Sequence, residues 1–146
     1  MRRRFFEHLA LVLGLSGTAC PSNSGPPPDT AKQAVADAAT RLEGNWTLVE
    51  FQPAQPLEPM LAQLLAAQMN RLVVTFHAGT MHVEGLGVSA DRTFNVTSAA
   101  ADGFSASIVD PTNVAYRVDG AFLGQDVGFT SLTDPWRGQG KLRRAR

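Results

Sequence analysis

The chain has 146 residues, of which 44% are hydrophobic and 18% are charged, and its formal net charge at pH 7 is zero. This length and composition are typical of one globular domain with short appendages, and they exclude a largely disordered chain. The balanced charge gives no overall field that would attract nucleic acid, and the single cysteine excludes an intrachain disulfide and any metal site built from several thiolates.

Residues 1–19 have the features of a bacterial export signal. Arg2–Arg4 give a positive start, Leu9–Leu15 (LALVLGL) form a short apolar stretch, and Gly17–Ala19 supply the small residues that a signal peptidase needs. The apolar stretch is too short to span a bilayer stably, so we do not expect it to be a membrane anchor. We therefore predict that residues 1–19 are removed as a signal peptide.

The only cysteine directly follows those small residues. Thr18, Ala19 and Cys20 resemble the lipobox of bacterial lipoproteins, in which the cysteine is diacylated after cleavage. The resemblance implies a lipid-anchored protein of the bacterial cell envelope, because two or more acyl chains hold a protein stably on a membrane. Pro21 stands where an aspartate can signal retention at the inner membrane, which favours the outer membrane. Two alternatives stay open, namely secretory cleavage that leaves Cys20 unmodified and export by the twin-arginine route.

A flexible tether and a short helix are expected next. Residues 20–29 (CPSNSGPPPD) are rich in Pro, Ser and Gly, which predicts a tether. Thr30 and Gln33 have the spacing of a capping box, and apolar residues then recur at helical spacing as far as Leu42. These features predict a short helix over residues 30–43.

The rest of the chain, residues 44–146, is predicted to form one β-barrel domain. Short segments that alternate between apolar and polar residues, with turn residues between them, are typical of β-strands. The expected strands cover residues 45–52, 71–78, 80–88, 92–99, 103–109, 113–119, 126–132 and 136–144. Pro59 suits the first position of a second helix, which we expect to end near Asn70, between the first two strands. Eight short strands at even spacing favour an antiparallel barrel, because closure removes exposed edges.

The start of the first strand carries a family resemblance. Gly44, Asn45 and Trp46 resemble the G-x-W signature of lipocalins and the wider calycins, and the resemblance covers residues 42–146. It implies a lipocalin-like barrel in which Trp46 packs across the floor, beneath an arginine that Arg143 or Arg144 supplies. The helix after the first strand resembles that of fatty-acid-binding proteins, in which such helices cap the barrel mouth.

The interior of the predicted barrel can be full or hollow. An eight-stranded barrel is either filled by side chains or holds one small ligand. The side chains that could fill it are Phe76, Phe94, Phe104, Tyr116, Phe122 and Phe129. The glycines that could leave space, or allow close packing around the floor, are Gly85, Gly87, Gly138 and Gly140. If a ligand binds beneath the second helix, we expect its site to comprise Trp46, Met60, Leu64, Phe76, Phe94, Phe104, Tyr116 and Trp136.

The remaining motifs give little support to catalysis or metal binding. His77, His82 and Glu84 form a conceivable zinc or copper set near a predicted two-residue turn, but solvated side chains on an outer face are the expected alternative. The sequence has no G-x-S-x-G nucleophile motif and no phosphate-binding glycine loop, so we expect no enzyme, with a hydrolase as the alternative, and no cofactor. The basic ending Lys141–Arg146 is expected to be a solvated face or a contact for anionic lipid head groups.

Together these features predict a non-catalytic cell-envelope lipoprotein. We expect its partners to be a membrane, through the lipid anchor, and a small hydrophobic or amphipathic ligand in the barrel, with no nucleic acid. The alternative is a structural or protein-interaction module of the envelope whose barrel is filled and whose outer surface meets other envelope proteins.

Overall fold

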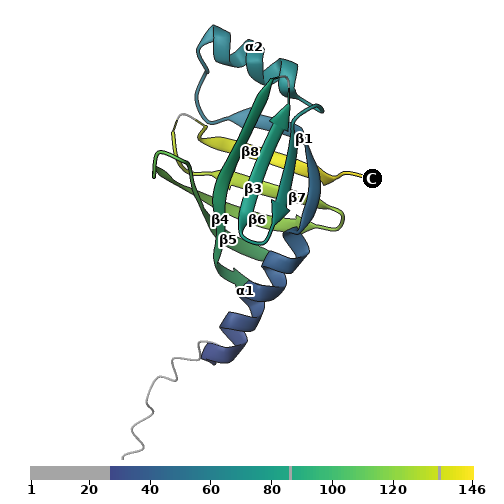
Figure 1. Ribbon diagram of the computed structural model, residues 1–146, viewed down its shortest axis with the longest axis vertical. Helices are drawn as coiled ribbons and strands as arrows, with labels where there is room; N and C mark the ends of the chain where they lie inside the picture. Colours follow the sequence, from purple (N-terminus) through teal and green to yellow (C-terminus); the bar gives the residue numbers. More distant parts are fainter. Residues whose placement is uncertain (1–26, 86, 135) are drawn as a thin grey trace, which may run out of the picture.

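The computed structural model describes residues 27–85, 87–134 and 136–146, which form a closed barrel of eight antiparallel strands with two helices (Figure 1). The elements are α1 (Pro28–Leu42), β1 (Gly44–Pro53), α2 (Pro59–Gln68), β2 (Val73–His77), β3 (Thr80–Gly85), β4 (Val88–Ala100), β5 (Gly103–Val109), β6 (Ala115–Leu123), β7 (Asp126–Ser131) and β8 (Gly138–Arg144). Each strand pairs with its neighbours in the sequence, and β1 pairs with β8 to close the barrel. The predicted fold class, mainly β with an eight-stranded antiparallel barrel and one helix between the first two strands, is confirmed. The predicted signal peptide, Cys20 and the tether as far as residue 26 lie outside the described residues.

Turn chemistry sets the strand boundaries. His77 pairs with Thr80 across a two-residue turn in which Ala78 and Gly79 both have positive φ angles, as the predicted hairpin requires. Three strands begin later than predicted: β2 begins at Val73, β6 at Ala115 and β8 at Gly138.

The delay in β6 comes from the loop before it. Asn113 has a positive φ of 66°, and the backbone N–H of Val114 donates to the Asp110 carboxylate, so neither residue joins the ladder. The alternation of residues 114, 116 and 118 predicts an inward-facing Val114, and that prediction is wrong, because Val114 is 46% exposed.

The core is built from the inward-facing residues of the strands. In β4, Phe94 and Val96 are buried while Asn95 and Thr97 are exposed, which is the alternation that the pleat of a strand imposes. The buried apolar residues form one cluster, which comprises Ala38, Leu42, Trp46, Leu48, Val74, Phe76, Met81, Phe94, Val96, Phe104, Ala106, Phe122, Val127 and Leu142.

The first helix begins earlier than predicted and by a different device. α1 starts at Pro28, with Pro27 as the N-cap, so the last two residues of the predicted tether are helical. The predicted capping box is wrong: Thr30 lies inside the first turn, where its backbone N–H donates to the Pro27 carbonyl, and the Gln33 side chain donates to Asp37 instead. Proline at the first helical position replaces the cap, because its fixed φ suits a helix start and it has no N–H to satisfy.

The floor of the barrel is closed by the last turn of α1. Trp46 is 2% exposed, and its indole Nε1 donates to the Leu42 carbonyl over 2.7 Å. The Arg144 guanidinium lies 4.5 Å from the Trp46 ring and donates to the carbonyls of Glu43 (3.1 Å) and Arg41 (2.7 Å). Of the two arginines left open by the sequence, Arg144 therefore covers the tryptophan.

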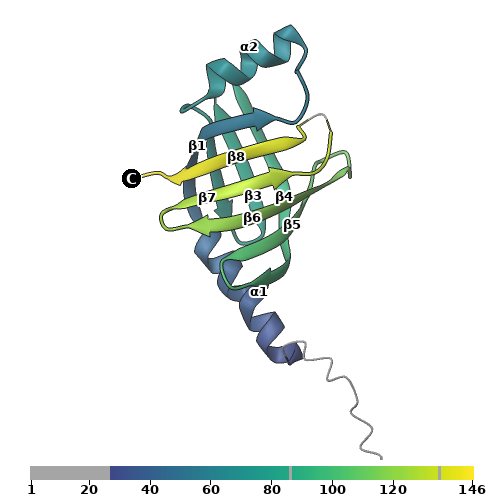
Figure 2. The ribbon, with the colours of Figure 1, turned by 180° about the vertical axis from the view of Figure 1, so that it is seen from behind.

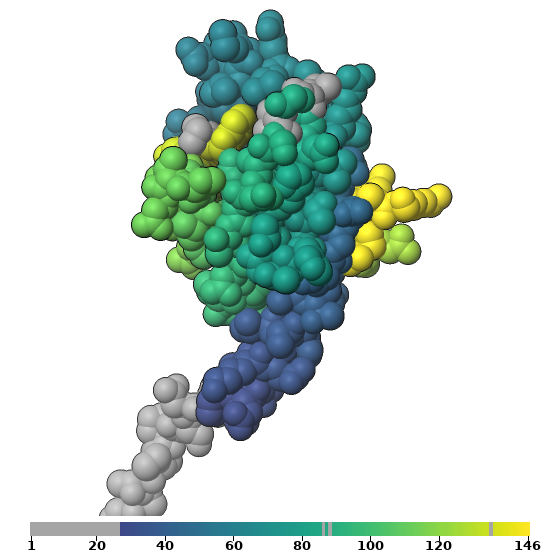
Figure 3. All heavy atoms as spheres, viewed as in Figure 1, coloured from purple at the N-terminus to yellow at the C-terminus, as the bar shows by residue number. Residues whose placement is uncertain are grey.

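The second helix lies at the other end of the barrel. Figures 1 and 2 show α2 across one end and α1 beneath the opposite end, and the space-filling view shows α2 forming the top of the molecule (Figure 3). Pro59 occupies the first turn of α2, as predicted. None of the helices formed by the described residues is long and apolar enough to cross a membrane.

Candidate functional site

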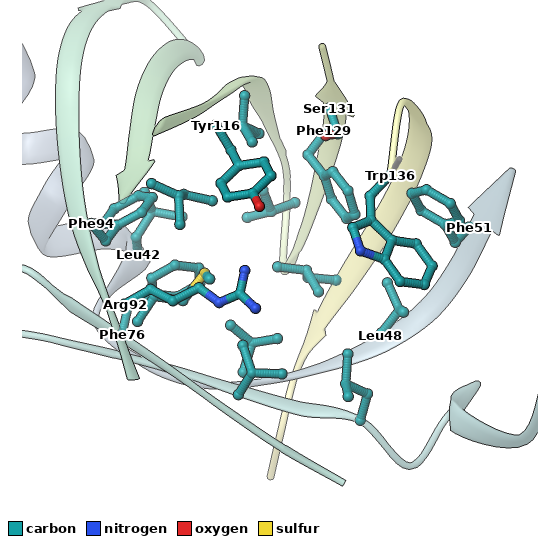
Figure 4. Close-up of a pocket in the computed structure, with 18 of the residues that line it drawn as sticks. Leu42, Leu48, Phe51, Phe76, Arg92, Phe94, Tyr116, Phe129, Ser131 and Trp136 are labelled. Atoms are coloured by element: carbon teal, nitrogen blue, oxygen red, sulfur yellow. The ribbon is translucent and has the colours of Figure 1, made fainter. Parts of the chain in front are cut away.

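A cavity of about 330 Å³ lies between the barrel wall and α2 (Figure 4). Its volume is at the lower end of the range of roughly 300–1,000 Å³ that small-molecule sites occupy. The aromatic residues that line it are Phe51, Phe76, Phe94, Phe104, Tyr116, Phe129 and Trp136. The aliphatic and methionine side chains are Leu42, Leu48, Leu64, Leu65, Leu72, Val74, Met81, Val83, Ile108, Val118, Val127 and Leu142, and the polar ones are Gln68, Arg92 and Ser131.

The structure brings most of the predicted ligand-site residues to this cavity. Those that line it are Leu64, Phe76, Phe94, Phe104, Tyr116 and Trp136. Trp46 and Met60 do not, and their predicted place in the site is corrected. The indole of Trp46 is committed to the floor, and Met60, in the first turn of α2, is 78% exposed. Leu64, Leu65 and Gln68, from the later turns of α2, reach the cavity instead.

The glycines do not create this space. Phe129 occupies the position that a Cβ at Gly140 would take, and the backbone around Gln52 does the same at Gly138. At Gly85 a Cβ would lie 2.7 Å from the Gln68 side chain. These three glycines allow close packing, which was the other interpretation of the sequence. Phe122, expected among the side chains that fill the interior, is buried in the core and packs on Phe104, but it does not line the cavity. The Arg41 guanidinium lies 3.8 Å from its ring centroid.

Arg92 is the one charged side chain among the described residues that line the cavity. It comes from β4, opposite Met81 of β3, and Figure 4 shows its guanidinium extending into the cavity. Its Nε is buried and has no hydrogen-bond partner among the described residues. Its guanidinium carbon lies 5.9 Å from the centroid of the Tyr116 ring. The sequence signal was available, because strand alternation puts residue 92 on the same face as Phe94 and Val96.

Gln68 links α2 to the barrel. It is 5% exposed, and its Nε2 donates to the Gly85 carbonyl at the end of β3 over 3.2 Å. Its Oε1 is buried and has no partner among the described residues. Gln68 therefore holds the last turn of α2 against the strands, and it is one of the polar residues that line the cavity.

Asp110 organises the loop between β5 and β6 next to the cavity. Its carboxylate accepts hydrogen bonds from the Thr112 hydroxyl (2.7 Å), the Thr112 and Val114 backbone N–H groups (2.9 Å each) and the Tyr116 hydroxyl (3.3 Å). These bonds, the one from the Thr112 side chain above all, lower the pKa of Asp110 below its ordinary value. Asp110 is thus an ionised carboxylate whose hydrogen-bonding capacity is used by its own loop.

The two histidines do not form a metal site with Glu84. His77 contacts Glu43 over 3.2 Å, whereas His82 contacts Asp91, so each imidazole has a separate carboxylate partner. Within the described ranges, no group of three or more His, Cys, Asp or Glu side chains could hold a metal ion. The basic ending is also divided: Arg144 belongs to the floor, and Arg143 pairs with Asp126 on the outside.

Comparisons of the chain with protein-family models, with curated proteins and with solved structures find no match. The resemblances to lipocalins and to bacterial lipoproteins therefore remain predictions from the sequence.

Proposed function

We propose that this chain is a bacterial cell-envelope lipoprotein, anchored through an acylated Cys20, whose barrel binds one small apolar or amphipathic molecule without transforming it. The binding half of the proposal is supported by the cavity of about 330 Å³, whose wall is formed mainly by aromatic and aliphatic side chains. Transfer of apolar ligand surface from water into such a site is the driving force for binding.

The envelope half of the proposal is supported by the sequence of residues 1–20. The positive start, the short apolar stretch and the small residues before Cys20 are the features on which it depends. The outer membrane is the proposed location, because proline follows the cysteine where aspartate would favour retention at the inner membrane.

The competing function, an interaction module with a filled barrel, requires an interior without room for a ligand. The described cavity favours binding over that alternative.

Calorimetric titration of the purified protein with 1-decanol, which has no charge, tests the binding half. Val118 lines the cavity, whereas its neighbour Arg117 is exposed on the outer face. We expect Val118→Phe to weaken binding by at least about tenfold, because the larger ring occupies ligand space, and Arg117→Phe to leave it unchanged. No heat of binding with the unmodified protein, or equal binding by both variants, would remove the case for an internal ligand.

Fractionation of the native host tests the envelope half. We expect the protein to sediment with membrane vesicles and Cys20→Ala to appear in the soluble fraction, because the acyl chains are lost. A Cys20→Ala protein that still sediments with membranes would contradict lipid anchoring.

A further inference from the structure

We propose that the ligand of the cavity is an amphipathic anion, whose acidic group binds the Arg92 guanidinium while its hydrocarbon part lies against the apolar wall. This inference rests on the proposed binding function and specifies its ligand class. It starts from the one charged side chain that the described chain places in an otherwise apolar cavity.

Arg92 is a half-buried residue whose Nε is shielded from water, so part of its guanidinium lacks both hydration and a protein acceptor. Removing a charged group from water is unfavourable unless hydrogen bonds or an opposite charge compensate. Among the described residues, Nε of Arg92 has no hydrogen-bond partner, and no carboxylate forms an ion pair with its guanidinium. The Tyr116 ring, at 5.9 Å, is a neutral neighbour near the outer limit of a cation–π contact.

The nearby carboxylates are committed elsewhere. Asp91 precedes Arg92 in β4, so its side chain lies on the opposite face of the strand, where it contacts His82. Asp110 is engaged by its loop and by Tyr116, since Oδ1 accepts three hydrogen bonds and Oδ2 accepts one from the Tyr116 hydroxyl. A ligand that brings its own negative charge would therefore supply what the described protein does not.

The unpaired polar atoms of the described residues are the second feature that favours a ligand with a polar end. Two buried side-chain atoms in the described part of the chain lack a hydrogen-bond partner, Arg92 Nε and Gln68 Oε1, and both residues line this cavity. Buried polar groups in native proteins are nearly always paired, so such groups gathered at one site require an explanation. A ligand head group explains the donor directly, because a guanidinium binds carboxylate, sulfate and phosphate oxygens through paired N–H donors.

The volume limits the size of the ligand. If a group about the size of a water molecule takes about 30 Å³, the cavity of about 330 Å³ holds roughly ten such groups. Decanoate, whose ten carbons include that of the carboxylate, is therefore a suitable probe, and 1-decanol is its uncharged match.

The test compares both probes on the full-length protein, on Arg92→Met, which keeps much of the side-chain volume, and on Arg92→Lys, which keeps the charge. The matched control is Arg117→Met, which removes an arginine with a 71% exposed side chain on the outer face of β6. We expect the unmodified protein to bind decanoate at least about tenfold more tightly than 1-decanol at pH 7.5. Arg92→Met should weaken decanoate binding by about 10- to 100-fold and leave 1-decanol binding unchanged. Arg92→Lys should retain part of the preference for decanoate over 1-decanol. Arg117→Met should change the affinity for neither probe.

The outcomes separate this inference from the function on which it rests. Equal affinity for the two probes, or decanoate binding that Arg92→Met does not weaken in a folded protein, would overturn the anion site while leaving an apolar binding function intact. Binding of neither probe to the unmodified protein would overturn the proposed function and the inference together. Thermal unfolding of each variant establishes that it is folded.

Discussion

Neighbouring arginines at the end of the chain should differ sharply in their contribution to stability. Arg144 lies over the Trp46 ring and donates hydrogen bonds to two carbonyls at the end of α1. Arg143 pairs only with Asp126 on the outer surface among the described residues. We expect Arg144→Ala to destabilise the protein and Arg143→Ala to leave the free energy of unfolding within experimental error, because exposed ion pairs contribute little.

The contacts of Arg144 set the expected loss in the free energy of unfolding. A cation over a tryptophan face contributes about 0.5–2 kcal/mol, depending on exposure. The two hydrogen bonds from the charged guanidinium add to this, but Arg144 is an exposed residue, so solvent screening reduces their contribution. We therefore expect Arg144→Ala to lower the free energy of unfolding by about 1–3 kcal/mol. Arg144→Lys should lie between, because an ammonium keeps the charge but not the planar fork.

Urea unfolding followed by tryptophan fluorescence measures these differences, and thermal unfolding gives a second readout at roughly 4 °C per kcal/mol for a domain of this size. A double-mutant cycle of Arg144→Ala with Trp46→Leu isolates the contact between the two side chains, for which we expect a coupling of about 0.5–2 kcal/mol. If Arg144→Ala proves as silent as Arg143→Ala, or the coupling is zero, the arginine does not hold the floor and the reasoning fails.

Two further predictions concern close packing and acid stability. Gly138→Ala should destabilise the protein by about 1–3 kcal/mol in the same urea assay, because its Cβ would collide with the backbone at Gln52. Gly103→Ala, whose Cβ meets only ordinary contacts, should destabilise it far less. Similar values for the two variants would contradict the close packing at Gly138. Because the pKa of Asp110 is lower in the folded protein than its ordinary value of 3.8, its stabilising contribution is complete above that value and is lost as the pH falls through the folded-state pKa. Asp110→Asn should therefore lose less stability than the unmodified protein between pH 5 and pH 2, and identical pH profiles would show that the loop bonds do not matter.

The fold could be predicted because its signals are local and repeated. Alternation in segments such as Arg92–Ala99 and proline at the start of α2 each report on nearby backbone, and eight such segments leave few architectures. The capping-box prediction was wrong because another local signal begins the helix earlier. Pro28 already begins the helix, so Thr30 comes too late to cap it.

The candidate site could be predicted only in part. Strand periodicity places Phe76, Phe94 and Phe104 inside, but it does not say whether inward side chains meet and fill the barrel or stop short of one another. Met60 shares a helical face with Leu64, yet only tertiary structure shows that the first turn of α2 stays outside the cavity. The charge of Arg92 predicts exposure, whereas its position in the strand predicts an inward side chain, and the structure follows the position.

The two helices cover opposite ends of the barrel, and this arrangement limits the route by which a ligand would reach the cavity (Figures 1 and 2). The last turn of α1 closes one end, and the cavity extends from Leu42 in that turn to Leu64 and Gln68 of α2. A ligand of the proposed kind would therefore enter and leave at the α2 end, because Trp46 and Arg144 close the other end against α1.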